Sequence, residues 1–501
     1  MFHLLTLYFL SWQSTTAVVG GQIPLFDSVE RNWAITPESL FAIGSCSKAF
    51  LVSAMGILVE DFASGKNTTA LPHGIQTFTW DTKIRELFPD GEWELADAWA
   101  SQKANLRDVL THVSGLPRHD FSYSFQDTSL DVVKRLRYLK PAFELREQWY
   151  YNNQMYVLGA HIISKYAGVP FSSWWSNGRR IPYWLEGDAM EVVAGPGGVV
   201  SSTVDMTKWL AMLLHKGVDP RTNLTVIPKA AYEESTTAHS VSLGKPSSPI
   251  TSLIGYGMGW MRLSYQGRDM VMHTGSLPGF QTLVAFMPSD KLGIVGVENT
   301  DDPSGTLSAV PLRILEDLLG LPHSIPGILA QSSKFTTYPP PLRSTSLAFE
   351  DPIPATVALE EFTGTYVNAG YGNFTLCTPA SVSAYCRQVL NDYAAVRNVS
   401  ASDLPSALYA AWPRLWSSKL RLHHSSNMTF KLALESLFVD GYGRDRTPFV
   451  YSITEGADIE VECALHDGRV AGCGIMHGLD EFKTPPEGTM EERADVWFTK
   501  V

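Results

Sequence analysis

The chain has 501 residues, of which 45% are hydrophobic, and a formal net charge of −12 at pH 7. This length exceeds one ordinary domain and predicts two, each with enough apolar residues to bury a core. The acidic balance and the lack of a Lys/Arg cluster argue against a general binder of nucleic acid or anionic membranes. We also expect no metal or nucleotide cofactor, because the sequence has neither zinc-type Cys/His spacing nor a Gly-rich phosphate loop between a strand and a helix.

An apolar run opens the chain at residues 2–12, and the small residues 14–17 follow it. This pattern is typical of a signal peptide cleaved after Ala17, although the positive residues that normally precede the apolar run are missing. The run is too short for a stable membrane span.

The first motif that carries chemistry is Ser45-Cys46-Ser47-Lys48, where an apolar helical run begins. Residues i and i+3 share a helix face, so the Lys48 amine is expected beside the Ser45 hydroxyl. A buried lysine loses part of its preference for charge and can accept the serine proton. The same Ser-x-x-Lys pattern recurs at residues 242–245, among prolines and without an apolar run, where we expect a loop.

Further segments follow in a fixed order along the first two thirds of the chain. A Tyr-x-Asn motif at Tyr151 and Asn153 runs into the helical pattern of residues 157–168. A His-Thr-Gly-Ser motif at residues 273–276 precedes two strand-like runs, 282–287 and 292–299, separated by a turn. A closing helix is expected at residues 307–321. Three more segments belong to this series: LRDVLTHVSGLP at 106–117, GPGGVVSSTVDM at 195–206 and YGMGW at 256–260.

Together these segments resemble the serine beta-lactamase and penicillin-binding-protein superfamily, within it the class C beta-lactamase, DD-peptidase and esterase branch, which is peptidase S12-like. The resemblance covers about residues 35–320. It implies an α+β domain, in which an antiparallel sheet is flanked by helices and accompanied by a helical subdomain. It also implies a serine hydrolase.

The resemblance assigns roles to the catalytic motifs. Ser45 would be the nucleophile, Lys48 the amine that activates it, and Tyr151 a phenolic proton shuttle. Asn153 would orient the amine or the acyl group. A shift of one residue, to Tyr150, stays open because Tyr-x-Asn also occurs there.

The strand motif is assigned to substrate binding, through His273, Gly275 and Ser276, with the backbone N–H groups of Ser45 and Ser276 as the oxyanion hole. Penicillin-recognising members usually carry lysine at the position of His273. A histidine is mostly neutral at pH 7 and is a weaker anchor for a substrate carboxylate. This departure favours esterase, amidase or acyltransferase chemistry over efficient beta-lactam hydrolysis.

Two other reactive side chains near these motifs are expected to be structural. His112 is interpreted as a hydrogen-bonded histidine within the family's turn, because buried polar groups are normally paired. Cys46 follows the nucleophile, but its side chain points elsewhere on the helix and is expected to pack.

The composition changes near residue 326. We predict a first domain at 1–325, a linker rich in Pro, Ser and Thr at 326–355, and an all-β domain at 356–501 built from short apolar segments between turns. Residues 359–366 and Tyr371-Gly372 resemble the lipocalin-like barrel attached to some relatives of this peptidase family. Its role could equally be accessory to the substrate entrance or oligomer, or purely stabilising.

The sequence features that bear on cellular location favour two different compartments. Four of the five cysteines lie in the C-terminal domain and could form two bridges, and five Asn-x-Ser/Thr sequons are present. These favour a secreted glycoprotein. Family members, however, place a helix and two strands before the nucleophile, and only 44 residues precede Ser45. If residues 1–17 are core strands instead of a signal peptide, the protein would be cytoplasmic.

The preferred function is therefore hydrolysis of an ester or amide through an acyl-Ser45 intermediate, with a small-molecule or peptide substrate. Two alternatives stay open. One is an acyltransferase of small-molecule biosynthesis that uses the same residues, and the other is a catalytically silent binding protein. The oligomeric state is not predicted.

Overall fold

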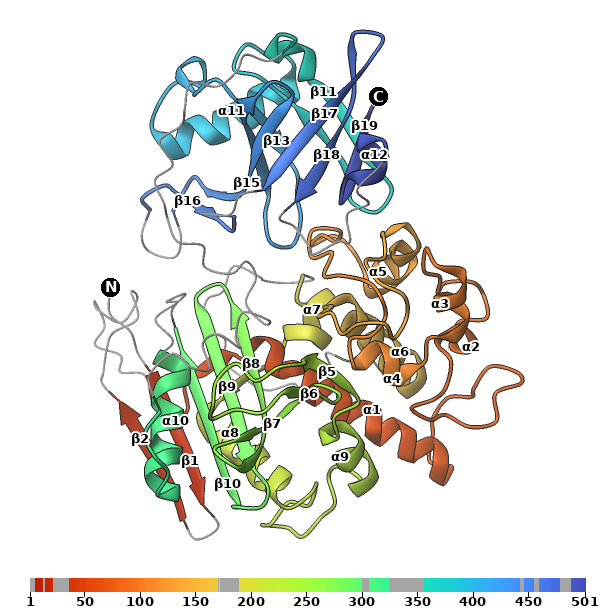
Figure 1. Cartoon of the computed structure of the whole chain (residues 1–501), viewed down its shortest axis with the longest axis vertical. Helices are drawn as coiled ribbons and strands as arrows, with labels where there is room; N and C mark the ends of the chain where they lie inside the picture. The colour runs from red at the N-terminus through yellow and green to blue at the C-terminus, as the bar shows by residue number, and fades with distance from the viewer. Residues whose placement is uncertain are drawn as a thin grey trace. The chain divides into compact units, whose positions relative to one another are not determined.

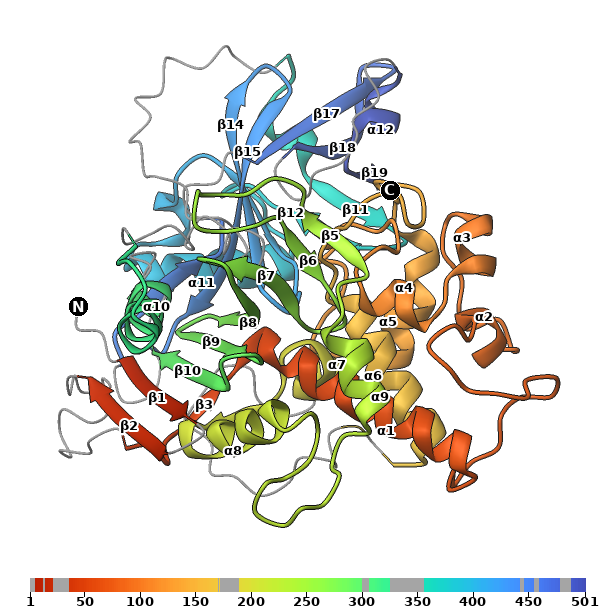
Figure 2. The same ribbon diagram turned by 60° about the horizontal axis from the view of Figure 1, so that its bottom comes forward.

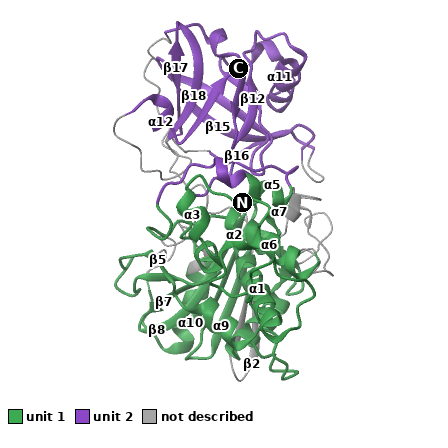
Figure 3. Cartoon of the chain, turned by 90° about the vertical axis from the view of Figure 1, so that its right-hand side faces the viewer, with its two compact units in different colours: residues 1–115, 128–134, 144–338 green, residues 116–127, 135–143, 339–501 purple. Residues whose placement is uncertain are grey.

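The structure is a computed structural model that describes residues 5–11, 14–20, 36–169, 171, 189–299, 306–324, 356–441, 446–454, 459–477 and 488–501. The chain divides into two compact units, coloured separately in Figure 3. Unit 1 comprises residues 1–115, 128–134 and 144–338, and unit 2 comprises residues 116–127, 135–143 and 339–501. The expected linker, residues 326–355, lies outside the described residues.

An antiparallel sheet of eight strands forms the centre of unit 1, in the order β2-β1-β10-β9-β8-β7-β6-β5 (Figures 1 and 2). Its strands are β1 (Leu5–Ser11), β2 (Ser14–Gly20), β5 (Ser240–Leu243), β6 (Ile254–Tyr256), β7 (Met261–Tyr265), β8 (Arg268–Leu277), β9 (Phe280–Met287) and β10 (Leu292–Glu298). A separate pair joins β3 (Leu40–Ala42) to β4 (Val200–Ser202). The two strand-like runs expected after the His-Thr-Gly-Ser motif are therefore confirmed as β9 and β10.

Helices surround this sheet. They are α1 (Ser47–Ser64), α2 (Ile84–Leu87), α3 (Ala98–Lys103), α4 (Leu106–Leu110), α5 (Ser129–Arg135), α6 (Gln154–Ala167), α7 (Ala189–Gly197), α8 (Thr203–Leu214), α9 (Lys229–Thr236) and α10 (Thr306–Leu319). The short 3-10 helix η1 (Gly44–Cys46) precedes α1, and another, η2 (Leu136–Tyr138), lies in a segment of unit 2. The closing helix expected at 307–321 is confirmed as α10. Both α1 and α6 end at a glycine in the left-handed conformation, which has no Cβ to oppose it.

The two faces of the sheet carry different helices because successive side chains of a strand point to opposite faces. Met272 of β8 belongs to the core cluster that includes Leu312 of α10. On the other face, Gly293 of β10 lies against Leu210 of α8, and Gly275 of β8 lies against the turn before α1. Figure 2 shows α1 and α8 on one side of the sheet and α10 on the other.

One local expectation was wrong. Residues 242–245 were expected to form a loop, but Ser242 and Leu243 belong to strand β5. This strand pairs with β6 at the edge of the sheet, with a register shift between Val241 and Leu243. The prolines that suggested a loop come only after the strand has ended.

Unit 2 is built on a near-closed antiparallel barrel, with the order β12-β11-β19-β18-β17-β15-β14-β13 and with β16 paired to β15. The two ends of this order meet where Cys377 and Tyr409 exchange backbone hydrogen bonds, both 2.8 Å. The strands are β11 (Gly364–Asn368), β12 (Gly372–Leu376), β13 (Leu408–Ala411), β14 (Lys419–Ser426), β15 (Thr429–Phe438), β16 (Phe449–Ser452), β17 (Glu460–His466), β18 (Arg469–His477) and β19 (Val496–Lys500).

The predicted fold class, an α+β domain followed by a barrel, is confirmed, but the second part is not purely β. Helix α11 (Ala384–Arg397) packs on β13, β15 and β16, and short helical turns η5 (Leu359–Phe362), η6 (Ala401–Asp403) and α12 (Met490–Arg493) accompany it. Ser383 caps α11 by accepting from the Cys386 N–H group. The sequence pattern missed this helix because it is rich in polar residues and buries only one face.

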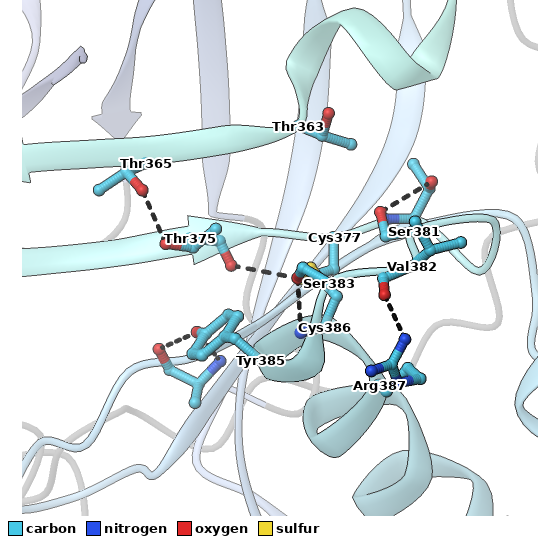
Figure 4. The surroundings of a disulfide bond; sticks show 12 residues. Thr363, Thr365, Thr375, Cys377, Ser381, Val382, Ser383, Tyr385, Cys386 and Arg387 are labelled. Carbon is cyan, nitrogen blue, oxygen red and sulfur yellow. Dashed lines mark hydrogen bonds between the residues drawn. A yellow bond between two sulfur atoms is a disulfide. The ribbon is translucent and has the colours of Figure 1, made fainter.

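Four cysteines of unit 2 form two disulfides, Cys377–Cys386 and Cys463–Cys473. The first ties the start of α11 to the end of β12 (Figure 4). The second joins paired residues of the β17–β18 hairpin. The remaining cysteine, Cys46, is a buried thiol.

Segments 116–127 and 135–143 also belong to unit 2. His119 Nδ1 lies 2.7 Å from the Tyr371 hydroxyl, and the Lys140 ammonium donates to the carbonyl oxygen of Ala494 at 2.8 Å. The Leu415 N–H group donates to the carbonyl oxygen of Tyr123 at 3.1 Å. These contacts join two early segments of the chain to the barrel.

Candidate active site

The Ser45 hydroxyl and the Lys48 amine meet at the start of helix α1. Ser45 lies in the 3-10 turn Gly44–Cys46, and α1 begins at Ser47. The Lys48 Nζ donates to Ser45 Oγ at 3.2 Å. Ser45 is half-buried, whereas Lys48 is fully buried. The expected pairing of hydroxyl and amine on one face of the helix is therefore present in the structure.

Neutral oxygen atoms and aromatic rings surround the Lys48 amine. It donates to Asn153 Oδ1 at 2.8 Å and to the Pro196 carbonyl oxygen at 2.9 Å. The Tyr151 ring centroid lies 4.7 Å from Nζ and the Tyr156 ring centroid 5.2 Å. These contacts hold the amine beside Ser45.

The structure distinguishes between the two registers of the Tyr-x-Asn motif. Asn153 reaches Lys48, whereas Asn152 Oδ1 accepts from the Met155 N–H group at 3.0 Å at the start of α6. Tyr151 is buried beside Lys48, and Tyr150 is only half-buried. The geometry thus favours Tyr151 and Asn153.

His112 takes a supporting position behind this motif. Its Nδ1 atom accepts from the Asn152 N–H group at 3.2 Å, and its ring centroid lies 4.4 Å from that of Tyr151. The His112 carbonyl oxygen accepts from the Tyr150 N–H group at 2.8 Å. This fully buried histidine holds the backbone of the Tyr-x-Asn segment, as expected of a structural residue.

His273 lies beneath the site, fully buried, with both ring nitrogens engaged. Nδ1 lies 2.6 Å from the Thr274 carbonyl oxygen, which can only accept, so Nδ1 carries the proton. Nε2 then accepts from the Tyr256 hydroxyl at 3.2 Å. Burial and the nearby Lys48 lower the pKa of His273 to about 3, so the ring is neutral at pH 7. The His273 side chain is enclosed by protein atoms in this structure.

Gly275 and Gly44 bring strand β8 against the turn that carries Ser45. A Cβ atom on Gly275 would lie 1.9 Å from the Ile43 carbonyl oxygen and 3.2 Å from the Ser45 backbone nitrogen. A Cβ atom on Gly44 would lie 2.8 Å from the Ser276 backbone nitrogen. Only glycine permits this approach. The backbone nitrogens of Ser45 and Ser276 therefore both lie at the contact between strand β8 and this turn.

Cys46 does not take part in the polar network around Lys48. Its thiol lies 3.4 Å from the His273 carbonyl oxygen, and burial raises its pKa. A protonated thiol is a poor nucleophile. The packing role expected for Cys46 agrees with this position.

The GPGGV segment, residues 195–199, contributes to the site although its sequence pattern suggested no role. The Ile43 N–H group donates to the Val199 carbonyl oxygen at 3.0 Å, and the Val199 N–H group donates to Ser47 Oγ at 3.0 Å. These bonds place the Pro196 carbonyl oxygen on Lys48. A backbone acceptor has no side-chain signature, so only the dense glycines of the segment could have signalled a close approach.

Comparison with known proteins places the chain in a family. A family model described as Beta-lactamase matches residues 14–177 and 173–318, which is more than half of the chain. The chain belongs to the beta-lactamase family and is a beta-lactamase-related serine hydrolase. The resemblance inferred from the motifs is confirmed.

Three curated proteins are similar to the chain, and two of them are named hydrolases. The unguisins hydrolase ungD of Aspergillus violaceofuscus is 26% identical over 415 residues, which is 69% of each chain. The unguisins hydrolase ungD' of Aspergillus campestris is 27% identical over 307 residues, 54% of each chain. Penicillin-binding protein 4* of Bacillus subtilis is 23% identical over 347 residues, covering 59% of this chain and 69% of the relative.

The solved structures to which the chain is similar share less sequence with it. The octameric penicillin-binding protein homologue from Pyrococcus abyssi is 17% identical with a TM-score of 0.48, covering 94% of this chain and 93% of that one. D-amino acid amidase from Ochrobactrum anthropi is 18% identical with a TM-score of 0.47, covering 63% and 94%. Within the described residues, no helix is long and apolar enough to cross a membrane, and no group of three His, Cys, Asp or Glu side chains is placed to hold a metal ion.

Proposed function

We propose that the protein cleaves an amide or ester through a covalent acyl-Ser45 intermediate. The observation that carries this proposal is the 3.2 Å contact between Lys48 Nζ and Ser45 Oγ, in a site where Asn153 and Pro196 hold the amine. An amine at hydrogen-bond distance activates a serine hydroxyl by accepting its proton.

In the acylation step, Lys48 acts in its neutral form, which donates to Asn153 and Pro196 and directs its lone pair to Ser45. It takes the hydroxyl proton as Ser45 Oγ forms a bond to the substrate carbonyl carbon. The oxyanion is stabilised by the backbone N–H groups of Ser45 and Ser276. The bond to the leaving nitrogen or oxygen then breaks, and that atom receives a proton through the Tyr151 phenol. The proton lost by Tyr151 is replaced from Lys48, which restores the amine.

In the second step, water attacks the acyl carbon, gives its proton to the same groups and releases Ser45 and a carboxylic acid. Replacing water with an alcohol or amine would make the protein an acyltransferase. We propose water as the acceptor because two curated relatives are named hydrolases.

The environment of His273 supports a substrate without an essential carboxylate beside strand β8. The ring is neutral and buried, so it adds no positive charge there. We therefore propose that the preferred amide or ester substrate lacks a penicillin-like carboxylate beside the bond that is cleaved. Unguisins are the first compounds to test, on the strength of the two relatives.

The test is covalent labelling followed by peptide mass spectrometry. A fluorophosphonate and, separately, an activated ester are expected to give one stoichiometric adduct on Ser45. The Ser45→Ala variant should give none. Ser242→Ala is the matched control, because Ser242 begins the second Ser-x-x-Lys match but lies in strand β5. It should label like the parent protein.

Two other outcomes would contradict hydrolysis and support one of the alternative functions. No adduct on a protein whose thermal unfolding shows it to be folded would indicate a silent binding protein. Transfer of the acyl group to an added alcohol, with little free acid formed, would indicate an acyltransferase.

We also propose that the protein passes through a secretory pathway. The two disulfides support this, because such bridges persist in oxidising compartments. The sequon residues Asn223, Asn373, Asn398 and Asn427 are exposed, and Asn67 is half-buried. Strand β1 pairs with β10 along residues 5–11, which supports the alternative that this run is core. Secretion from a eukaryotic host, with a mass decrease after glycosidase treatment, tests the proposal.

A further inference from the structure

The interior of the unit 2 barrel leaves almost no space. Leu420 and Leu422 of β14 and Leu432 of β15 point inward and line an apolar cavity of about 20 Å³. This volume is that of about one water molecule, and apolar walls give a water no partners. At this cavity the barrel interior is a packed apolar core.

The opposite face of the same two strands is different. Side chains alternate along a strand, so the odd-numbered residues of β14 and β15 face outward. They line an open pocket of about 400 Å³, a size typical of small-molecule sites. Its lining residues are Arg397 of α11, Arg421 and His423 of β14, Lys431, Leu432, Ala433 and Glu435 of β15, and Val450, Ser452 and Thr454.

Positive charge exceeds negative charge in this lining. Arg421 forms a two-pronged pair with Glu435, with distances of 2.6 and 3.2 Å, and Glu435 is only 3% exposed. Lys431 pairs with Glu460 at 2.7 Å. Within the described part of the chain, no ion pair or hydrogen bond is formed by the Arg397 side chain. Three cations and one carboxylate therefore line the pocket.

The lowered pKa of His423 agrees with this excess of positive charge. Burial, Arg421 and Arg397 lower its pKa to about 4, so it is neutral at pH 7. Its Nε2 atom accepts a hydrogen bond from the Arg421 guanidinium, which has no acceptor of its own. Arg397 of α11 and Arg421 of β14 thus both act electrostatically on the His423 ring.

We propose that this outer pocket of unit 2 binds a small oxyanion with two negative charges, such as hydrogen phosphate or a dicarboxylate. Guanidinium groups match the geometry of phosphate and carboxylate oxygens and bind them with charge-assisted hydrogen bonds. Arg397 supplies donors not used within the described residues, and Arg421, held in place by Glu435, supplies a second positive charge. The site is separate from the Ser45 chemistry and does not depend on it.

The test is calorimetric titration of the full chain with hydrogen phosphate and with succinate, at an ionic strength kept constant with chloride. Saturable binding of either dianion is expected. Arg397→Gln should weaken it at least about tenfold, because it removes a charged hydrogen-bond donor. Arg387→Gln is the matched control. Arg387 lies on the same helix but donates to the Val382 carbonyl oxygen outside the pocket (Figure 4).

A second readout reports on the pocket itself. The bound dianion should raise the pKa of His423, measured from its ring proton signals by NMR, and at the same dianion concentration Arg397→Gln should reduce this rise. Arg421 is left unchanged because its loss would leave Glu435 as an unpaired buried charge. Binding of hydrogen phosphate alone would identify phosphates as the ligand class, and binding of succinate alone would identify dicarboxylates. No saturable binding, or equal weakening in the two variants at equal thermal stability, would overturn the proposal.

Discussion

Replacing Asn153 with alanine removes the amide oxygen that accepts from the Lys48 amine at 2.8 Å. Hydrogen bonds to charged groups contribute about 1.5–3 kcal/mol. If the bond is needed in the acylation transition state, its loss lowers the rate about 10- to 150-fold. The contacts of Lys48 with Ser45 and Pro196 persist, so some activity should remain.

The assay is the second-order rate of fluorophosphonate labelling at Ser45, with Asn152→Ala as the matched control. The Asn152 amide oxygen accepts from the Met155 N–H group at the start of α6, whereas Asn153 Oδ1 is the amide oxygen that accepts from Lys48. Loss of the Asn152 amide should cost about 1 kcal/mol of stability and change the labelling rate less than about threefold. Asn153→Ala labelling within twofold of the parent rate, or an equal loss in both variants, would refute the reasoning.

Three further predictions concern stability. Gly275→Ala should destabilise the protein by about 1–3 kcal/mol and abolish labelling, because its Cβ would lie 1.9 Å from a backbone oxygen. In Gly244→Ala, the nearest atom to the new Cβ lies at 3.9 Å. This variant should keep the parent's thermal unfolding temperature and the parent's labelling. The pKa of His273 falls from 6.5 to about 3 on folding, so the unfolded state binds more protons between these values. The stability that this ring contributes is therefore complete above pH 6.5 and is lost as pH falls toward 3. Denaturant unfolding of His273→Gln should show a shallower acid decline than the parent, and identical pH curves would contradict the assignment. Replacing Cys377 and Cys386 together with alanine opens a short loop and should cost about 2–3 kcal/mol, measured by denaturant unfolding of unit 2. An unchanged midpoint would show that the bridge adds no stability.

Much of the local structure follows from the sequence. The spacing of Ser45 and Lys48 predicts a shared helix face, and the runs at 282–287 and 292–299 predict adjacent strands, because helix and strand periods depend on backbone geometry alone. The motif order also pointed to the family. Helix α11 was missed because a polar helix with one packed face shows little periodic signal.

Tertiary structure decided which distant groups meet. The carbonyl oxygen of Pro196 accepts from Lys48, 148 residues away in the sequence, because strands β3 and β4 pair. The sequence could not predict this contact, because any residue type can supply a backbone carbonyl oxygen. The sequence predicted that His273 would be neutral, but only packing shows that it is buried beneath the site.

The early segments 116–127 and 135–143 belong with the barrel through contacts such as that between His119 and Tyr371, which no local pattern encodes. The sequence by itself determined many of the helices and strands and the types of the reactive residues, because these depend on neighbours along the chain. Burial, backbone partners and the grouping of segments depend on neighbours in space, so only the folded chain determines them.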